Sequence, residues 1–256
     1  SLFHGTKYIQ AVKSISEGEN SEDGNKYNFS DYGDNPPYLG MFEASRWSTG
    51  SSLAAFEALE AGIAEITFNI SGGLHHAMPN HASGFCIFND PVIAIKAMLA
   101  KGYRVAYVDI DAHHGDGVQH AFYDTDDVLT ISIHESGQFI FPGTGFTDEI
   151  GEGKGIGYSV NVPLYPNTDD EIYQLAFTSI VPPIINSFKP DILVSQLGID
   201  THFLDPITHM KITTQGFTEV VRQIKHLAPK KWLAVGGGGY DISAVARAWT
   251  LAYGAM

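Results

Sequence analysis

The sequence contains a single cysteine, Cys86, so no internal disulfide bond can form. Basic residues are also few: 15 Lys and Arg stand against 29 Asp and Glu, a formal net charge of −14 at pH 7. This balance repels nucleic-acid phosphates and anionic membranes, and no local basic patch offsets it. The longest apolar runs, such as residues 175–185, contain Pro182 and Pro183 and are shorter than the ~20 residues of a membrane helix. No basic stretch followed by an apolar signal region opens the sequence. These absences exclude direct nucleic-acid binding and a membrane span. They favour a cytoplasmic protein, or a nuclear one if the source is eukaryotic.

The 256 residues are 44% apolar and 17% charged, which is enough for one large folded domain. Continuous apolar runs, typical of strands buried on both faces, occupy residues 65–70, 104–110, 127–134, 191–197 and 231–235. Helical periodicity lies between them at residues 51–61, 91–101, 170–187 and 215–227, with Ser51 or Ser52 as the cap of the first helix. The polar residues 17–38 are expected to form a long surface loop. This alternation predicts a three-layer α/β/α sandwich with a mostly parallel central sheet.

Reactive side chains follow two of the predicted strands. After strand 104–110, Asp109, Asp111 and His113 share one face while the chain stays extended. One imidazole with carboxylates suits catalytic zinc or another first-row metal, whereas carboxylates alone would indicate magnesium or calcium. The pair His75–His76 follows strand 65–70. Because carboxyl ends of parallel strands meet at one edge of the sheet, we expect these groups to lie together.

Two further loops add polar side chains to the same edge. Asp200 and Asp205 follow strand 191–197, although Asp205-Pro206 alone also reads as an ordinary turn. Strand 231–235 runs into four glycines and Tyr240. The glycines lack the Lys-Ser/Thr of a phosphate loop and the Rossmann spacing, which argues against a nucleotide site. A close backbone approach to a ligand, with the Tyr240 phenol donating to a developing oxyanion, explains them better.

Taken together, these motifs resemble the zinc-dependent histone deacetylase family, which includes acetoin-utilisation-type bacterial and archaeal deacetylases. The resemblance runs from about residue 3 to the end of the sequence, and the Leu after Gly72-Gly73 together with Asp116 is closer to class I members. It implies the arginase/deacetylase fold and removal of the acetyl group from Nε-acetyl-lysine in proteins, with release of acetate and no organic cofactor. The motifs that carry it are 72–77 (GGLHHA), 84–86 (GFC), 89–90 (ND), 109–117 (DIDAHHGDG), 141–145 (FPGTG), 205–206 (DP) and 236–240 (GGGGY).

The resemblance also implies a role for each residue of the site. His76 would take a proton from the attacking water and return it to the leaving amine, while His75 supplies positive charge and Tyr240 polarises the acetyl carbonyl. The implied ligands of one zinc ion are Asp111, His113 and Asp205. The implied carboxylate partners of His75 and His76 are Asp109 and Asp116.

The implied substrate-binding residues are Asp34 at the rim of an apolar tube, Gly84, Phe85 and Phe141 in its walls, and Ile212 near the rim. Family members also carry structural potassium. The positions that match one potassium site are Asp109, Asp111, His113, Ser132 and Ile133, and those that match a second are Phe122, Thr125, Val128 and Tyr158.

Family members carry a further N-terminal stretch with a strand of the sheet and a channel arginine. We therefore expect residues 1–256 to be a single catalytic domain without the family's N-terminal segment and C-terminal end, and by themselves to expose a strand edge and to aggregate.

Three other functions remain open: deacetylation of a small acetylated amine such as an acetylpolyamine, a binuclear manganese ureohydrolase of the arginase type, and a non-catalytic acetyl-lysine binder or scaffold. Position 212 is Ile, where class I and II members usually have Leu or Met, and polyamine-specific members have an acidic gatekeeper, which disfavours the polyamine alternative. The His75–His76 pair and Tyr240 argue against a ureohydrolase. A non-catalytic relative usually lacks one catalytic residue, and none is missing here. The acidic composition suits cationic partners, either lysine-rich protein tails or polyamines.

Overall fold

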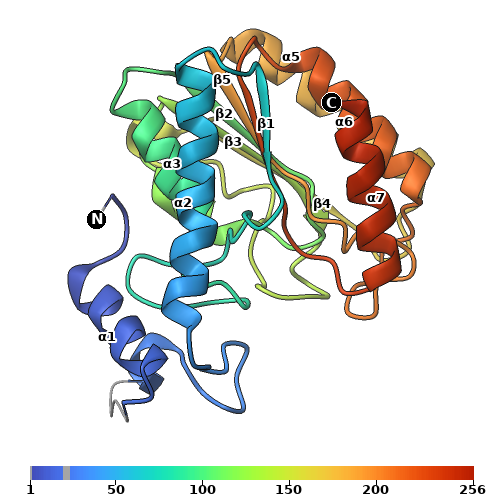
Figure 1. The fold of residues 1–256 in the computed structure, drawn as a ribbon. Coiled ribbons are helices and arrows are strands. Elements are labelled where there is room, and N and C mark those ends of the chain that lie inside the picture. Colours follow the sequence, from blue (N-terminus) through green and yellow to red (C-terminus); the bar gives the residue numbers. More distant parts are fainter. Residues whose placement is uncertain (1, 20–23) are drawn as a thin grey trace.

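The computed structural model describes residues 2–19 and 24–256. A six-stranded sheet lies at its centre, in the order β1-β6-β5-β2-β3-β4, and every neighbouring pair is parallel (Figure 1). The strands are β1 (Ile66–Asn69), β2 (Val105–Asp109), β3 (Val128–Glu135), β4 (Ser159–Leu164), β5 (Ile192–Gln196) and β6 (Trp232–Val235). The predicted α/β sandwich with a parallel sheet is confirmed.

Helices cover both faces of this sheet (Figure 1). One layer consists of α2 (Met41–Glu60), α3 (Asp90–Leu99) and α4 (Asp116–Phe122), and the other of α5 (Asp170–Phe188), α6 (Thr214–Leu227) and α7 (Ile242–Ala255). A further helix, α1 (Thr6–Ser16), packs beside α2, and two short 3-10 turns span Gly24–Tyr27 and Gly153–Gly155. Among the described residues, no helix is long and apolar enough to cross a membrane.

Alternation along the buried strands explains why the sheet has a core on each face. Every residue of β2 is buried. Val105 and Tyr107 pack under α2–α4, whereas Ala106 and Val108 point to the opposite core under α5–α7. A strand that is apolar at every position therefore needs two covering layers, which is the arrangement seen.

Strand β4 and helices α1, α2 and α4 differ from the sequence prediction. Strand β4 was not predicted, because it is a half-exposed edge strand that contains Asn161 and Pro163. Helices α1 and α4 were not predicted either. Helix α2 begins at Met41 and not near residue 51, so Ser52 lies inside the helix and the predicted cap is wrong. Its buried serines explain the weak apolar signal, since Ser48 donates its hydroxyl to the Ser71 carbonyl in the loop after β1 and Ser52 donates to the Asp90 carboxylate at the start of α3.

The predicted surface loop 17–38 has a small core of its own. Residues 20–23 of this loop lie outside the described residues. Of the rest, Tyr27 and Phe29 are buried and pack against the ring of Tyr8, in a third apolar cluster under α1. These contacts anchor the loop, which also carries the predicted rim residue Asp34.

His4, just before α1, provides a test of stability against pH. Its ring is 3% exposed; Nδ1 lies 3.0 Å from the Met78 carbonyl, and Nε2 accepts the Asn89 N–H at 2.9 Å. Burial lowers the pKa of His4 from 6.5 to about 4. Because the unfolded chain then binds more protons, stability falls as pH falls between these two values, by about 2 kcal/mol from pH 7 to pH 4.5.

The variant His4→Gln offers a donor and an acceptor in place of the ring and does not titrate. We expect urea unfolding at the two pH values to show a smaller loss of stability in His4→Gln than in the wild type. The exposed His226→Ala variant should keep the wild-type loss. Equal losses in all three proteins would contradict a neutral buried His4.

Candidate active site at the carboxyl edge of the sheet

The loops after β1, β2, β5 and β6 meet at one edge of the sheet. The register of the strands explains this. Asp109 at the end of β2 lies beside Gln196 at the end of β5, and Asn69 at the end of β1 lies beside Val235 at the end of β6. Each following loop therefore starts at the same level. The His75–His76 pair, His113 and the glycine run come together here, as the sequence predicts.

Each histidine of the His75–His76 pair has its own carboxylate. Nδ1 of His75 lies 2.7 Å from Oδ2 of Asp109, and Nδ1 of His76 lies 2.7 Å from Oδ1 of Asp116. The two Nε2 atoms are 3.0 Å apart. All four side chains are buried or nearly so. The predicted pairing of these four residues is present in the structure.

The environment separates the proton affinities of the two rings. Burial lowers the pKa of both, but the charges of Asp109 and Asp111 outweigh it at His75 and raise that pKa to about 9. At His76 the positive charge of His75 adds to burial, and the pKa falls to about 4. Neutral His76 can accept a proton at neutral pH, while His75 remains a cation.

Two residues at the start of α3 hold the backbone around this pair. The carboxylate of Asp90, which is 0% exposed, accepts the N–H groups of Gly73 and Leu74 at 2.9 Å and the Ser52 hydroxyl at 2.5 Å. The side chain of Asn89 donates to the carbonyl of His75 and caps α3. The sequence showed Asn89-Asp90 as a motif, but only the fold shows that these side chains support the histidine turn.

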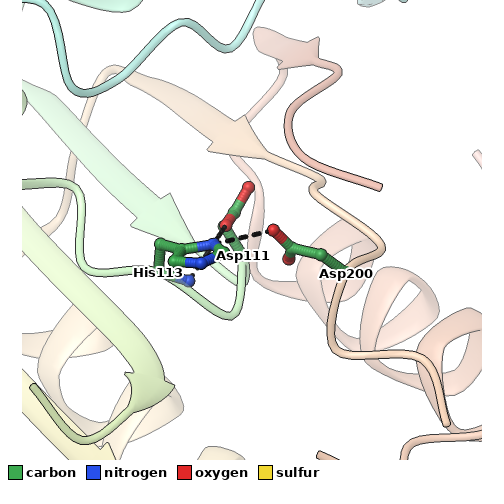
Figure 2. A group of neighbouring side chains, drawn as sticks. All are labelled: Asp111, His113 and Asp200. Carbon is green, nitrogen blue, oxygen red and sulfur yellow. Dashed lines mark hydrogen bonds and ion pairs between the residues drawn. The ribbon is translucent and has the colours of Figure 1, made fainter. Parts of the chain in front are cut away.

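Figure 2 shows a candidate metal-binding group of Asp111, His113 and Asp200. It lies next to the histidine pair, since Nε2 of His75 is 4.0 Å from Oδ1 of Asp111. Ligand atoms of Asp111, His113 and Asp200 lie within 4.8 Å of one another, and all three residues are buried. Nδ1 of His113 lies 2.9 Å from Oδ2 of Asp200 and 3.2 Å from Oδ1 of Asp111. Burial and the charge of Asp111 raise the pKa of Asp200. A cation among these groups would relieve the repulsion between two buried carboxylates, so the residues fit a metal ion.

The third carboxylate of this group is Asp200, whereas the sequence prediction named Asp205. The oxygens of Asp205 accept the N–H groups of Ile207 and Tyr240 at 3.0 and 2.9 Å, and the residue is 9% exposed. Asp205 as a ligand stays a prediction. A further residue, Gln196, was not predicted; its amide donates to Oδ2 of Asp111 at 2.7 Å and helps to orient it. Two polar residues, Ser195 and Gln196, at the end of a strand that begins Ile-Leu-Val were the available signal for Gln196.

A cavity of about 420 Å³ reaches His113 of the metal-binding group. The rings of Phe85 and Phe141 form part of its walls and are 57% and 42% exposed, and Phe141 stands edge-on to His76 with the ring centroids 4.9 Å apart. Burial raises the pKa of the Tyr240 phenol, which stays protonated and able to donate a hydrogen bond. The cavity is lined by Asp34, His76, Gly84, Phe85, His113, Phe139, Ile140, Phe141, Ile207, His209 and Tyr240.

Gly84 is needed where the cavity wall meets the catalytic pair. Its φ is +51°, and a Cβ atom there would lie 2.4 Å from the ring of His76 and 2.8 Å from the ring of Phe141. Its N–H donates to Oδ2 of Asp34 at 2.6 Å. The rim carboxylate is thus fixed to the wall, and both predicted residues line the cavity.

The prediction that Ile212 lies near the rim of the cavity is wrong. It is 2% exposed and packs in the core with Met210 and Phe217. The segment 207–212 alternates, so that Ile207 and His209 face the cavity while Met210 and Ile212 point inward. The hydrogen bond between the Ile212 N–H and the Thr201 carbonyl fixes this register.

The residues predicted for potassium form two local groups. In the first, β2 and β3 pair so that Asp109 lies beside Ser132, with Asp111, His113 and Ile133 following at the same edge. In the second, Tyr158 precedes β4 and its carbonyl accepts the N–H of Thr130 at 2.9 Å. Phe122, Thr125 and Val128 form the connection from α4 to β3. Potassium itself stays a prediction at both places.

The fold and the site define a parallel α/β protein of the arginase/deacetylase type with a candidate metal centre at the carboxyl edge of the sheet. The histone deacetylase domain model matches residues 1–256. The chain belongs to the histone deacetylase family.

Similar proteins and structures agree with this assignment. The chain is 45% identical to acetoin utilization protein AcuC of Bacillus subtilis (strain 168), over 97% of this chain and 66% of that protein. It is 42% identical to AcuC of Staphylococcus xylosus, over 98% of this chain and 66% of that protein. The crystal structure of a histone deacetylase homolog from Aquifex aeolicus superimposes with a TM-score of 0.92 at 37% identity, over 98% of this chain and 67% of that one. A structure of such a homolog complexed with SAHA gives a TM-score of 0.93. The chain therefore spans about two thirds of the length of these relatives.

Proposed function

We propose that the protein to which this chain belongs hydrolyses the amide bond of Nε-acetyl-lysine in proteins, releasing acetate, with one zinc ion at the site. The observation that carries this proposal is the His75–His76 pair, in which each Nδ1 lies 2.7 Å from a carboxylate of its own while the surroundings raise the pKa of His75 and lower that of His76. The pair lies beside the metal-binding group and at the base of an apolar cavity. Such a separation of two titrating groups is typical of a site that has assigned base and charge-stabilising roles.

We further propose that Asp111 and His113 hold the metal together with Asp205. The backbone N–H of the cavity residue Tyr240 positions Asp205, and the charge of His113 acts on it. Asp200 would then orient the His113 ring from the buried side through its 2.9 Å contact. A bound zinc ion would supply Lewis-acid polarisation of the acetyl carbonyl and would lower the pKa of the attacking water.

The protein residues supply the proton transfers. Neutral His76 takes a proton from the attacking water, and Asp116 keeps its Nδ1–H oriented so that Nε2 is the accepting atom. The cationic ring of His75 stabilises negative charge that develops next to it. Tyr240 donates its hydroxyl proton to a hydrogen bond with the carbonyl oxygen. As the water oxygen bonds to the acetyl carbon and the C–N bond breaks, His76 returns the proton to the leaving nitrogen, which gives the lysine side-chain amine and acetate.

Acetate release from an acetyl-lysine peptide tests this proposal, with the full-length protein and with metal removed by a chelator. We expect chelation to abolish release and added zinc to restore it. In Tyr240→Phe, kcat should fall roughly 100-fold or more with little change in KM, because a donor to the oxyanion is lost. Metal analysis should give one ion per chain, while two manganese ions would favour the ureohydrolase alternative. No release from a folded, metal-loaded protein would refute protein deacetylation.

A further inference from the structure

An ion pair that the proposed mechanism does not use lies at the mouth of the cavity. Glu135, at the end of β3, has a side chain that is 0% exposed, while the side chain of His209 is 57% exposed and lines the cavity. Oε1 of Glu135 lies 2.7 Å from Nδ1 of His209, and Oε2 accepts the backbone N–H of the same residue at 2.9 Å. A buried acid thus fixes one imidazole at the entrance.

The backbone around His209 is fixed as firmly as its ring. Its carbonyl accepts the N–H of Asn167 at 2.9 Å, and its N–H is held by Glu135. The ring position is therefore set before any substrate arrives, so little conformational freedom is lost when a substrate contacts it.

Charge balance decides what this ring offers to a substrate. Within the described part of the chain, both contacts of the Glu135 carboxylate are with His209. A protonated imidazole would supply the cation that compensates this buried carboxylate. Since Nδ1–H is directed to Glu135, the remaining N–H at Nε2 is available to an acceptor in the cavity mouth.

The other polar group of the mouth has the opposite character. Asp34 is an acceptor, held by the Gly84 N–H at 2.6 Å and by the Asn28 amide at 3.2 Å. With the His209 imidazole protonated, the entrance would combine one acceptor with one charged donor, which matches the C=O and N–H groups of a peptide main chain. An acidic side chain next to the acetylated lysine would also suit the donor. A polyamine chain has only ammonium groups and offers His209 no acceptor.

We infer that His209, positioned by Glu135, is a specificity-determining residue that selects acetyl-lysine within peptides, with a preference for an acidic residue beside it. This inference rests on the proposed function of the same site. It favours an acetylated protein over an acetylpolyamine, a choice that the catalytic residues leave open.

The test uses two acetyl-lysine peptides that differ only in Glu or Gln next to the acetylated lysine, together with N-acetylputrescine. For the full-length metal-loaded protein, we expect kcat/KM to be about tenfold higher for the Glu peptide, mainly because its KM is lower. One charge-assisted hydrogen bond provides a difference of about this size. His209→Ala should remove that preference by raising KM for the Glu peptide. His209→Arg keeps the charge and should retain part of the preference. Glu135→Gln should weaken it.

Controls separate this role from a merely structural one. The surface variant His226→Ala should behave like the wild type, and the N-acetylputrescine rate should not fall in His209→Ala. The inference is wrong if the wild type treats the two peptides alike, or if His209→Ala slows both peptides equally.

Binding keeps the inference testable if no substrate is hydrolysed. Fluorescence anisotropy with labelled forms of the two peptides measures binding to the Tyr240→Phe protein with and without His209→Ala. A preference for the Glu peptide that depends on His209, without acetate release by the wild type, would support the inference and overturn the proposed hydrolysis. Neither release nor preference would overturn both.

Discussion

Replacing His76 with alanine is expected to lower kcat roughly 10²- to 10⁴-fold, the range that a positioned general base contributes. His76 is the ring that burial and the charge of His75 keep neutral, with a pKa of about 4. Its Nε2 faces that of His75 at 3.0 Å, and the ring lines the substrate cavity. The alanine variant has no other neutral base in this position, so proton removal from the attacking water would fall to solvent.

Metal content and folding must stay constant for this result to be informative. His76 is not among the three residues of the metal-binding group, so we expect His76→Ala to bind one metal ion with near wild-type affinity. Added imidazole should restore part of the rate, because the substitution leaves a ring-sized space beside the cavity. The variant His226→Ala, which removes an exposed histidine, should keep full activity. Retention of more than half of kcat in His76→Ala would exclude it as the base.

The largest expected loss of stability comes from Asp90→Ala. Asp90 is 0% exposed, so this change leaves the N–H groups of Gly73 and Leu74 and the Ser52 hydroxyl without their acceptor in the protein interior. Each buried group without a partner costs about 1–3 kcal/mol, so we expect unfolding free energy to fall by about 3 kcal/mol or more. Urea unfolding at pH 7 measures the loss.

Asp90→Ala should also reduce activity, because the loop 72–74 leads directly into His75 and His76. Asp90→Asn should cost less in both respects: one amide oxygen can accept the two N–H groups, and the Ser52 hydroxyl can rotate toward the amide nitrogen. Burial raises the pKa of Asp90 to about 6, so part of the charge penalty is relieved in the amide. The exposed variant Asp126→Ala serves as control. A stable, fully active Asp90→Ala protein would show that this carboxylate does not support the site.

Local sequence was sufficient for features that depend on neighbouring residues. Continuous apolar runs predicted five of the six strands, because a strand buried on both faces must be apolar at every position. The alternation of Asp109, Asp111 and His113 placed these side chains at the end of β2. The same reasoning predicted that the His75–His76 pair would meet them.

Features set by contacts between distant segments could not be read from local patterns. Ser52 and Asp90 interact across 38 positions, and Gln196 and Asp111 across 85, so no spacing rule identifies either pair. Helix α2 was predicted ten residues short for the same reason. Its serines look unsuited to a buried helix face until the loops that they contact are in place.

The sequence by itself determined the class of fold, the edge of the sheet that carries the chemistry, and the residue types gathered there. The tertiary structure alone decided which carboxylate lies against His113. It is that of Asp200, and not that of Asp205. It also decided that His209 faces the cavity while Ile212 is buried. The physical reason is that a loop has no periodicity of its own. Its path is set by hydrogen bonds to segments far away in sequence, such as those of His209 to Glu135 and of Thr213 to Asp170.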